Sequence, residues 1–202
     1  MAEQQPTKQK VQKVVDKWKM KGWYDIIAPE MFESKNIGQL VSSDEANLIN
    51  RRIKIGLGDM LGSFSQSTAY TALHLRVFEV TGKSARTKFI GHELVPGYVR
   101  TLSRRRRSII TQVDDVVTRD GVGVRVKLMC VSGLKVSEAV RADARHTLSI
   151  AVKEIAKNTD FNMLVQEMVF GKLSSKLYGT IKKMGPMKRV EIRKSEVKEN
   201  FE

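Results

Sequence analysis

The sequence has few of the residues from which disulfides, metal centres and catalytic sites are built. Cys130 is the only cysteine among 202 residues, so an intrachain disulfide is excluded and a reducing compartment is expected. The three histidines, His74, His92 and His146, fall on different expected elements, and none stands at metal-ligand spacing from another histidine or from the cysteine. We therefore expect no metal centre and no catalytic residue, and we interpret each histidine as structural or as facing a bound partner.

Signals for membranes and cofactors are also missing. The longest apolar runs are far too short to span a bilayer, and the polar, lysine-rich N-terminus lacks the apolar segment of a secretory signal. We therefore expect a cytoplasmic protein. Gly56 and Gly58 follow an expected strand, as in a dinucleotide-binding loop, but Leu61 stands where that motif needs a third glycine. No cofactor is expected.

Acidic residues are too few to balance the basic ones. The chain has 36 Lys and Arg against 22 Asp and Glu, which gives a formal net charge of +14 and a pI near 10.0. Such a charge describes either a solvated basic surface or a protein with a polyanionic partner. We favour the second, because self-repulsion opposes folding unless a partner such as a nucleic-acid backbone neutralises it.

The densest positive charge lies in a stretch without acids. No Asp or Glu occurs between Val99 and Gln112, and this stretch contains Arg100 and the four consecutive arginines 104–107. Adjacent guanidinium groups repel one another, so they become favourable only beside a dense negative charge. Other cations are spread over the whole chain. This distribution suits a protein that is embedded in folded RNA and touches phosphates on several sides.

The sequence thus supplies two sets of candidate RNA-binding residues. The candidate phosphate-binding cations are Lys8, Lys10, Lys13, Lys17, Lys19, Arg51, Arg52, Arg100, Arg104, Arg105, Arg106, Arg107, Arg141, Arg145, Lys182, Lys183, Lys188 and Arg189. The aromatic residues that could stack on a base are Trp18, Trp23, Tyr24 and Tyr98. For Trp23 and Tyr24 the alternative is packing in the core, which we favour for one of the two.

Periodicity predicts an α+β fold in three parts. Residues 1–21 form a basic N-terminal tail with a short helical pattern. Residues 22–134 form a β-rich core with one short helix, and residues 135–202 form a helical region with a returning strand and a charged tail. Strands are expected at residues 51–57, 71–80, 86–94, 108–118, 122–131 and 188–194. Helices are expected at residues 97–107, 140–157, 161–170 and 172–183, and a Gly/Ser-rich loop is expected at residues 58–68.

Four further expectations concern local detail. The helix that begins at Pro96 would carry the four arginines in its last turn. Asp120 and Gly121 would form the tight turn of a hairpin. Asp160 would cap the following helix, and the adjacent Asp114 and Asp115 would point to opposite faces of a strand, which makes them a poor acid/base pair.

Several segments, in order along nearly the whole chain from Lys21, resemble one known family. They are residues 21–32 (KGWYDIIAPEMF), 36–38 (NIG), 57–61 (LGDML), 89–94 (FIGHEL), 115–121 (DVVTRDG) and 128–131 (LMCV). The chain resembles the archaeal and eukaryotic small-subunit ribosomal proteins of the e-S-one family, called S-three-a-e in older usage. Its length is similar to that of archaeal members.

The resemblance implies a fold and a role. The fold is a curved, barrel-like antiparallel β-sheet with C-terminal helices, in which Trp23, Tyr24 and Pro29 belong to an anchoring N-terminal segment. The role is structural and non-enzymatic: binding small-subunit rRNA and neighbouring ribosomal proteins on the platform, near the 3′ end of the rRNA and the mRNA exit. Two alternatives stay open from the residues alone, an RNA-modifying or processing enzyme and a dissociable RNA-binding translation factor.

Overall fold

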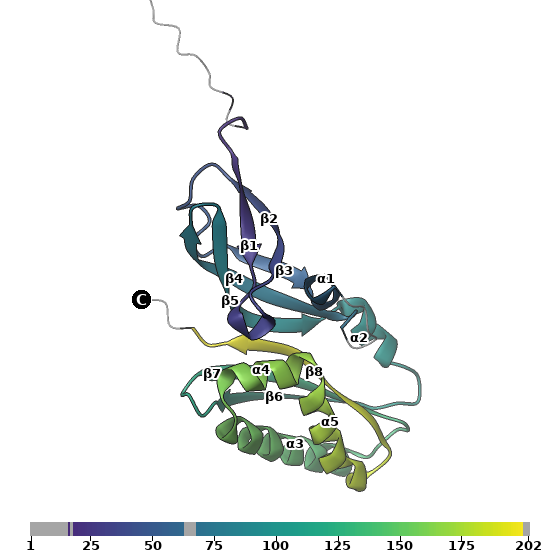
Figure 1. Cartoon of the computed structure of the whole chain (residues 1–202). Coiled ribbons are helices and arrows are strands. Elements are labelled where there is room, and N and C mark those ends of the chain that lie inside the picture. The colour runs from purple at the N-terminus through teal and green to yellow at the C-terminus, as the bar shows by residue number, and fades with distance from the viewer. Residues whose placement is uncertain (1–15, 17, 63–67, 200–202) are drawn as a thin grey trace, which may run out of the picture.

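The computed structural model describes residues 16, 18–62 and 68–199 (Figure 1). Four candidate cations, Lys8, Lys10, Lys13 and Lys17, lie outside the described residues. Along the chain the elements are β1 (Gly22–Ile27), η1 (Glu30–Phe32), β2 (Asn36–Ser42), β3 (Arg52–Gly56), α1 (Leu57–Leu61), β4 (Thr71–Thr81), β5 (Ser84–Leu94), α2 (Pro96–Leu102), β6 (Ile109–Val117), β7 (Gly123–Ser132), α3 (Glu138–Asn158), α4 (Phe161–Val169), α5 (Lys172–Ile181), η2 (Lys182–Met184) and β8 (Met187–Val197).

The strands form one mixed sheet of eight strands that is not closed. Its path is β2-β1-β5-β8-β7-β6, and β4 pairs with the other edge of β5 and carries β3. The pair β1–β5 is parallel, over residues 25–27 and 84–86, whereas the other pairs are antiparallel. The prediction of a wholly antiparallel sheet was therefore wrong, and its barrel-like curvature is not confirmed. The mixture of a sheet with C-terminal helices is confirmed.

The hairpin of β6 and β7 is confirmed with its register, which runs from Ile109 opposite Val131 to Val117 opposite Gly123. Gly121 has the positive φ, 79°, that the turn requires. The Asp120 side chain caps a helix, because its Oδ2 accepts a hydrogen bond from the backbone N–H at the start of α4, at 2.7 Å. The residue expected to cap α4, Asp160, makes no such bond. The cap of α4 thus comes from the hairpin turn, which ties helix and hairpin together.

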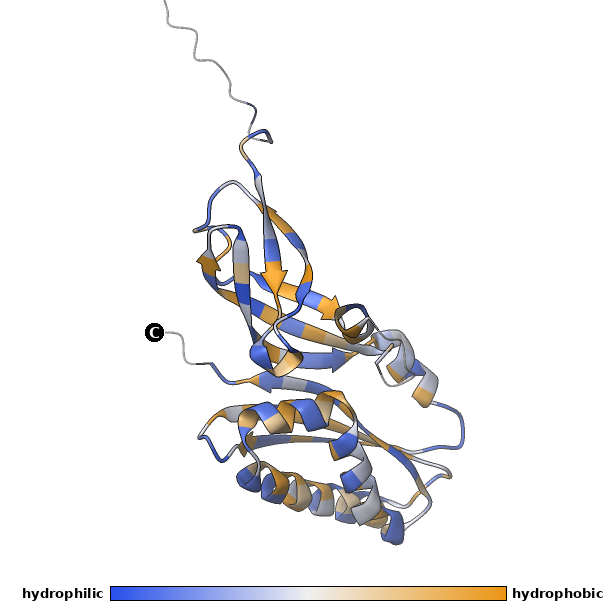
Figure 2. Ribbon diagram, in the orientation of Figure 1, coloured by the Kyte–Doolittle hydropathy of each residue, from blue (hydrophilic) through white to orange (hydrophobic). Residues whose placement is uncertain are grey.

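Helices α3, α4 and α5 bury their apolar sides against β6, β7 and β8 (Figure 1). Leu148 and Val152 of α3, Leu164 of α4, Leu177 of α5 and Val126 of β7 are all at most 1% exposed. Each such side chain contributes roughly 1.5–3 kcal/mol through burial. Figure 2 shows the resulting alternation of hydrophilic and hydrophobic bands along helices and strands.

Strand β8 joins the two halves of the sheet, because it pairs with β7 along its length and with β5 over a short stretch. At that junction the strands come so close that a Cβ on Gly91 would lie 2.2 Å from the backbone oxygen of Ser195. Beside it, the buried His92 pairs through Nδ1 with Ser195 Oγ, at 2.6 Å. Beyond the strand, Glu199 forms ion pairs with Arg76 and Lys88. The expected charged tail is therefore attached to the sheet as far as Glu199.

Three further expectations need correction. Residues 57–61 form the short helix α1, although a loop was expected from residue 58. Residues 22–27 and 36–42 form an antiparallel hairpin, β1–β2, where only an extended path around Pro29 was expected. Helix α2 ends at Leu102, five residues earlier than predicted, so the four arginines follow the helix instead of closing it.

Candidate nucleic-acid interface

The four arginines lie on a short connection between α2 and β6, residues 103–108, which we call the arginine loop. Arg104, Arg105 and Arg106 are exposed and Arg107 is half-buried. The loop is a defined turn: the N–H of Arg107 donates to the carbonyl of Arg104 at 3.4 Å, and Arg106 adopts a positive φ of 62°. Among the described residues, no acidic side chain forms an ion pair with these arginines or with Arg100. Their charge is therefore available to a partner.

The arginine loop lies beside the beginning of β8, and together they form a basic groove. We use this name for the open hollow of about 420 Å³ that is lined by Tyr98, Thr101, Leu102, Arg104, Arg107, Val131, Lys188 and Arg189. Four predicted cations, two from the loop and two from β8, converge here. Figure 2 shows the loop after α2 as largely hydrophilic. Clustered guanidinium and ammonium groups with few acids around them form an electrostatic footprint for phosphate.

Tyr98 is the aromatic residue at the centre of this region, and it stacks on another tyrosine. Its ring lies 4.5 Å from that of Tyr70, with 6° between the planes. Its hydroxyl accepts a hydrogen bond from Arg189 Nη1 at 2.6 Å and donates to Glu191 Oε1 at 3.4 Å. Arg189 Nε lies 3.5 Å from the same carboxylate oxygen. Arg189 is thus oriented by two partners and keeps a planar donor group at the edge of the groove.

Burial shifts the acid–base properties of this cluster. It raises the pKa of the Glu191 carboxyl, against the opposing effect of the Arg189 charge. It also raises the pKa of the Tyr98 hydroxyl, with the neighbouring Glu191 charge acting in the same direction. The cluster therefore combines a cation, a phenol and a carboxylate in a partly dehydrated site, where hydrogen bonds are stronger than in water.

The other candidate cations lie apart from the basic groove. Lys182 and Lys183 are exposed on η2, just before β8. Arg51 and Arg52 lie where β3 begins, Arg52 is opposite Arg76 of β4, and neither residue lines the basic groove. Lys19 is exposed near the first described residues.

The two arginines of α3 have an acidic partner. Arg141 Nη2 lies 2.6 Å from Glu138, and Arg145 Nη1 lies 3.1 Å from the same carboxylate. Further along this helix, Ser149 and Lys153 face the buried Asp114. The positive charge of α3 is therefore partly neutralised by the protein itself.

The remaining aromatic candidates are on the surface of the N-terminal half. Trp18 and Trp23 are 66% and 61% exposed, and Tyr24 is half-buried. Core packing was expected for either Trp23 or Tyr24 of β1, and neither side chain is fully buried. Lys21 lies over the Trp18 ring at 4.3 Å. Both tryptophans are open to a partner.

Reasoning from the sequence missed Tyr70 and Glu191. Tyr70 precedes β4 and is 28 positions before Tyr98 in the sequence, and no local pattern predicts that their rings stack. In the expected strand at residues 188–194, Glu191 is one of the charged residues that alternate with Val190 and Ile192, and this pattern assigns it no partner. Its position between Arg189 and Tyr98 depends on β8 crossing below α2.

Two features of the described residues bear on other chemistry. Within residues 16, 18–62 and 68–199, no three His, Cys, Asp or Glu side chains gather in a way that could hold a metal ion. In the same part of the chain, no helix is long and apolar enough to cross a membrane.

Comparisons with known proteins indicate the family. The family model of the Ribosomal S3Ae family matches residues 9–200. A protein of Methanothrix thermoacetophila named small ribosomal subunit protein eS1 is 41% identical over 189 residues, which cover 93% of this chain and 88% of that protein. A protein of the same name from Methanococcus maripaludis is 41% identical, over 90% of this chain and 80% of that protein. Another, from Saccharolobus islandicus, is 36% identical, over 91% of this chain and 88% of that protein. The chain therefore belongs to the Ribosomal S3Ae family.

Proposed function

We propose that this protein is a structural component of the small ribosomal subunit and binds its rRNA. The observation that carries the proposal is the basic groove, where Arg104, Arg107, Lys188 and Arg189 converge in a chain of net charge +14. Phosphate contacts of this kind position a protein on RNA without reading sequence. The names of its relatives in the Ribosomal S3Ae family support a ribosomal role.

A finer placement follows from the family resemblance. We propose that the protein lies on the platform of the subunit, near the 3′ end of the rRNA and the mRNA exit, among neighbouring ribosomal proteins and in the cytoplasm. Its contribution there is to support the folded rRNA, and not to catalyse a reaction. The exposed Trp18 and Trp23 supply a second contact surface at the other end of the sheet, for RNA or for a neighbouring protein.

Purified ribosomal particles test this proposal. Small subunits are isolated from cells that produce the tagged protein, washed with high salt and analysed by mass spectrometry. We expect the protein at one copy per subunit after the wash, because a protein embedded in the subunit dissociates only when many contacts break at once, and salt weakens each phosphate contact only in part. Loss from every ribosomal fraction contradicts the structural role. A large free cytosolic pool beside partial occupancy would instead indicate a factor that cycles on and off.

A further inference from the structure

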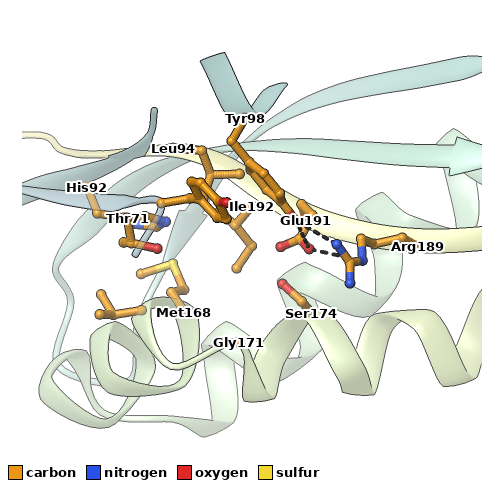
Figure 3. Close-up of a pocket in the computed structure, with 12 residues that line it drawn as sticks. Thr71, His92, Leu94, Tyr98, Met168, Gly171, Ser174, Arg189, Glu191 and Ile192 are labelled. Carbon is orange, nitrogen blue, oxygen red and sulfur yellow. Dashed lines mark hydrogen bonds and ion pairs between the residues drawn. The ribbon is translucent and has the colours of Figure 1, made fainter. Parts of the chain in front are cut away.

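A cavity of about 300 Å³ lies next to the basic groove and shares Tyr98 and Arg189 with it (Figure 3). We call it the tyrosine cavity. Its lining residues are Tyr70, Thr71, His92, Leu94, Tyr98, Met168, Val169, Gly171, Ser174, Arg189, Glu191 and Ile192. This volume is at the small end of the range for ligand pockets, so it admits a single flat group and not a long ligand.

The walls of the tyrosine cavity suit a flat aromatic group. The stacked rings of Tyr70 and Tyr98 form one side, and Figure 3 shows Tyr98 above the cavity and the buried Met168 below it. Aromatic faces and thioether groups both pack favourably against a π-system. A nucleobase inserted here stacks on the tyrosine side and contacts apolar side chains on the other.

Polar groups lie at both ends of the cavity: Thr71 and the buried His92 at one end, and Glu191, Ser174 and Arg189 at the end that adjoins the basic groove. Figure 3 shows the Glu191 carboxylate and the Ser174 hydroxyl pointing toward each other there, with Arg189 beside them. Both contacts of Glu191 with Tyr98 and Arg189 involve Oε1, which leaves Oε2 as an acceptor for a ligand. Because a carboxylate repels phosphate, the group that enters is a base, while its phosphates stay among the arginines and Lys188 of the groove.

The donors and acceptors at this end match one base best. Guanine presents two adjacent donors on its Watson–Crick edge, of which Glu191 Oε2 accepts one and the second lone pair of Oε1 accepts the other. It also presents acceptors at O6 and N7, to which arginine donates. Adenine, cytosine and uracil each offer only one donor position on that edge. We propose that the tyrosine cavity receives one unpaired guanine of the RNA strand whose phosphates lie in the basic groove. This inference rests on the proposed function.

Binding of short RNAs tests the inference. The probes are single-stranded oligouridylates that carry guanosine, adenosine or an abasic site at the centre, and fluorescence anisotropy measures their affinity for the full-length protein. We expect the guanosine probe to bind at least about fivefold more tightly than the other two, as one bidentate base contact provides. Equal affinity for the guanosine and abasic probes, with a retained salt dependence, overturns the guanine site and leaves the proposed function intact. Salt-independent binding of all probes contradicts the proposed function instead.

Variants locate the effect in the cavity. Glu191→Gln is expected to remove the preference for guanosine and to leave the affinity for the abasic probe near that of the wild type. Ser174→Leu fills the cavity without changing charge, and Thr180→Leu, at an exposed position of the same helix α5, is its matched control. A thermal melt verifies that both leucine variants fold. If Ser174→Leu keeps the guanosine preference, the base does not enter the cavity. Free GMP serves as a separate probe. If GMP binds as tightly as the guanosine oligonucleotide, the cavity is a site for a free nucleotide, and the assignment to an RNA strand is overturned.

Discussion

Replacing all four arginines of the arginine loop by alanine should weaken RNA binding without unfolding the protein. The side chains of Arg104, Arg105 and Arg106 are exposed, and the loop makes no ion pair with a described acid. The free energy of unfolding should therefore change by no more than about 0.5 kcal/mol. Because adjacent like charges repel one another, their removal favours a small increase in the free energy of unfolding.

The loss of affinity can be worked out from the number of charges. Each phosphate contact contributes roughly 0.7–0.9 to the slope of log K against log salt. Four contacts then account for a slope of about 3, and a rise from 50 to 200 mM salt weakens this part of the binding by about 60-fold. The variant should lack that part, so its affinity differs most from that of the wild type at low salt.

The assay is fluorescence anisotropy with a folded small-subunit rRNA transcript at several salt concentrations. Its matched control is the variant in which Arg141, Arg145, Lys153 and Lys157 become alanine, because it lowers the net charge by the same four units at positions on α3. Two of these cations are paired with Glu138, so a smaller change of slope is expected. Equal changes in both variants would mean that only net charge matters, and an unchanged slope in the loop variant would refute the assignment of phosphate contacts to the loop.

Three further predictions concern stability and reactivity. Gly91→Ala should destabilise the protein by about 2–4 kcal/mol in a denaturant titration, because the new Cβ would lie 2.2 Å from the backbone of β8. The control is Gly97→Ala, in open space on α2, which should stabilise the protein by up to about 1 kcal/mol. Equal effects of the two variants would contradict the close approach of the strands. Burial lowers the pKa of His92 from 6.5 to about 4, so the contribution of its neutral form to the free energy of unfolding is fully present above pH 6.5, and about 3 kcal/mol is lost as the pH falls toward 4. His92→Asn should remove this pH dependence, and the exposed His146→Asn is the control. If the stability of His92→Asn depends on pH as that of the wild type does, the reasoning is refuted. Burial raises the pKa of the Cys130 thiol to about 11, so a thiol reagent should label it only after unfolding, and rapid labelling of native protein would contradict its burial.

Local sequence patterns predicted much of the β structure, because alternation along a strand reports which face is buried. The β6–β7 hairpin is the clearest case. Asp114 and Asp115 were expected on opposite faces, and the structure places Asp114 under α3 and Asp115 on the outer face, bound to Arg125 at 2.7 Å. Alternation says nothing about which strands pair across long distances, so the parallel β1–β5 pair was missed.

The end of α2 shows where local signals were insufficient. A helical pattern and a favourable effect of cations at a helix C-terminus both favoured continuation through Arg107. The chain leaves the helix at Ser103 instead, since β6 must begin beside β7. As a result Arg104 and Arg107 line the basic groove together with Lys188 and Arg189 of β8.

The sequence by itself determined that this is a basic protein of mixed α and β structure with the segments of one family, because net charge, strand alternation and family segments are all local or additive properties. It also supplied all four cations of the basic groove as candidates among the others. Only the tertiary structure decided which of them act together. β8 returns between β5 and β7, and this long-range pairing brings Arg189 and Glu191 to Tyr98 and Lys188 to the arginine loop. The same packing gives Arg141 and Arg145 an acidic neighbour and leaves the arginine loop without one among the described residues, a difference that spacing along the chain does not contain.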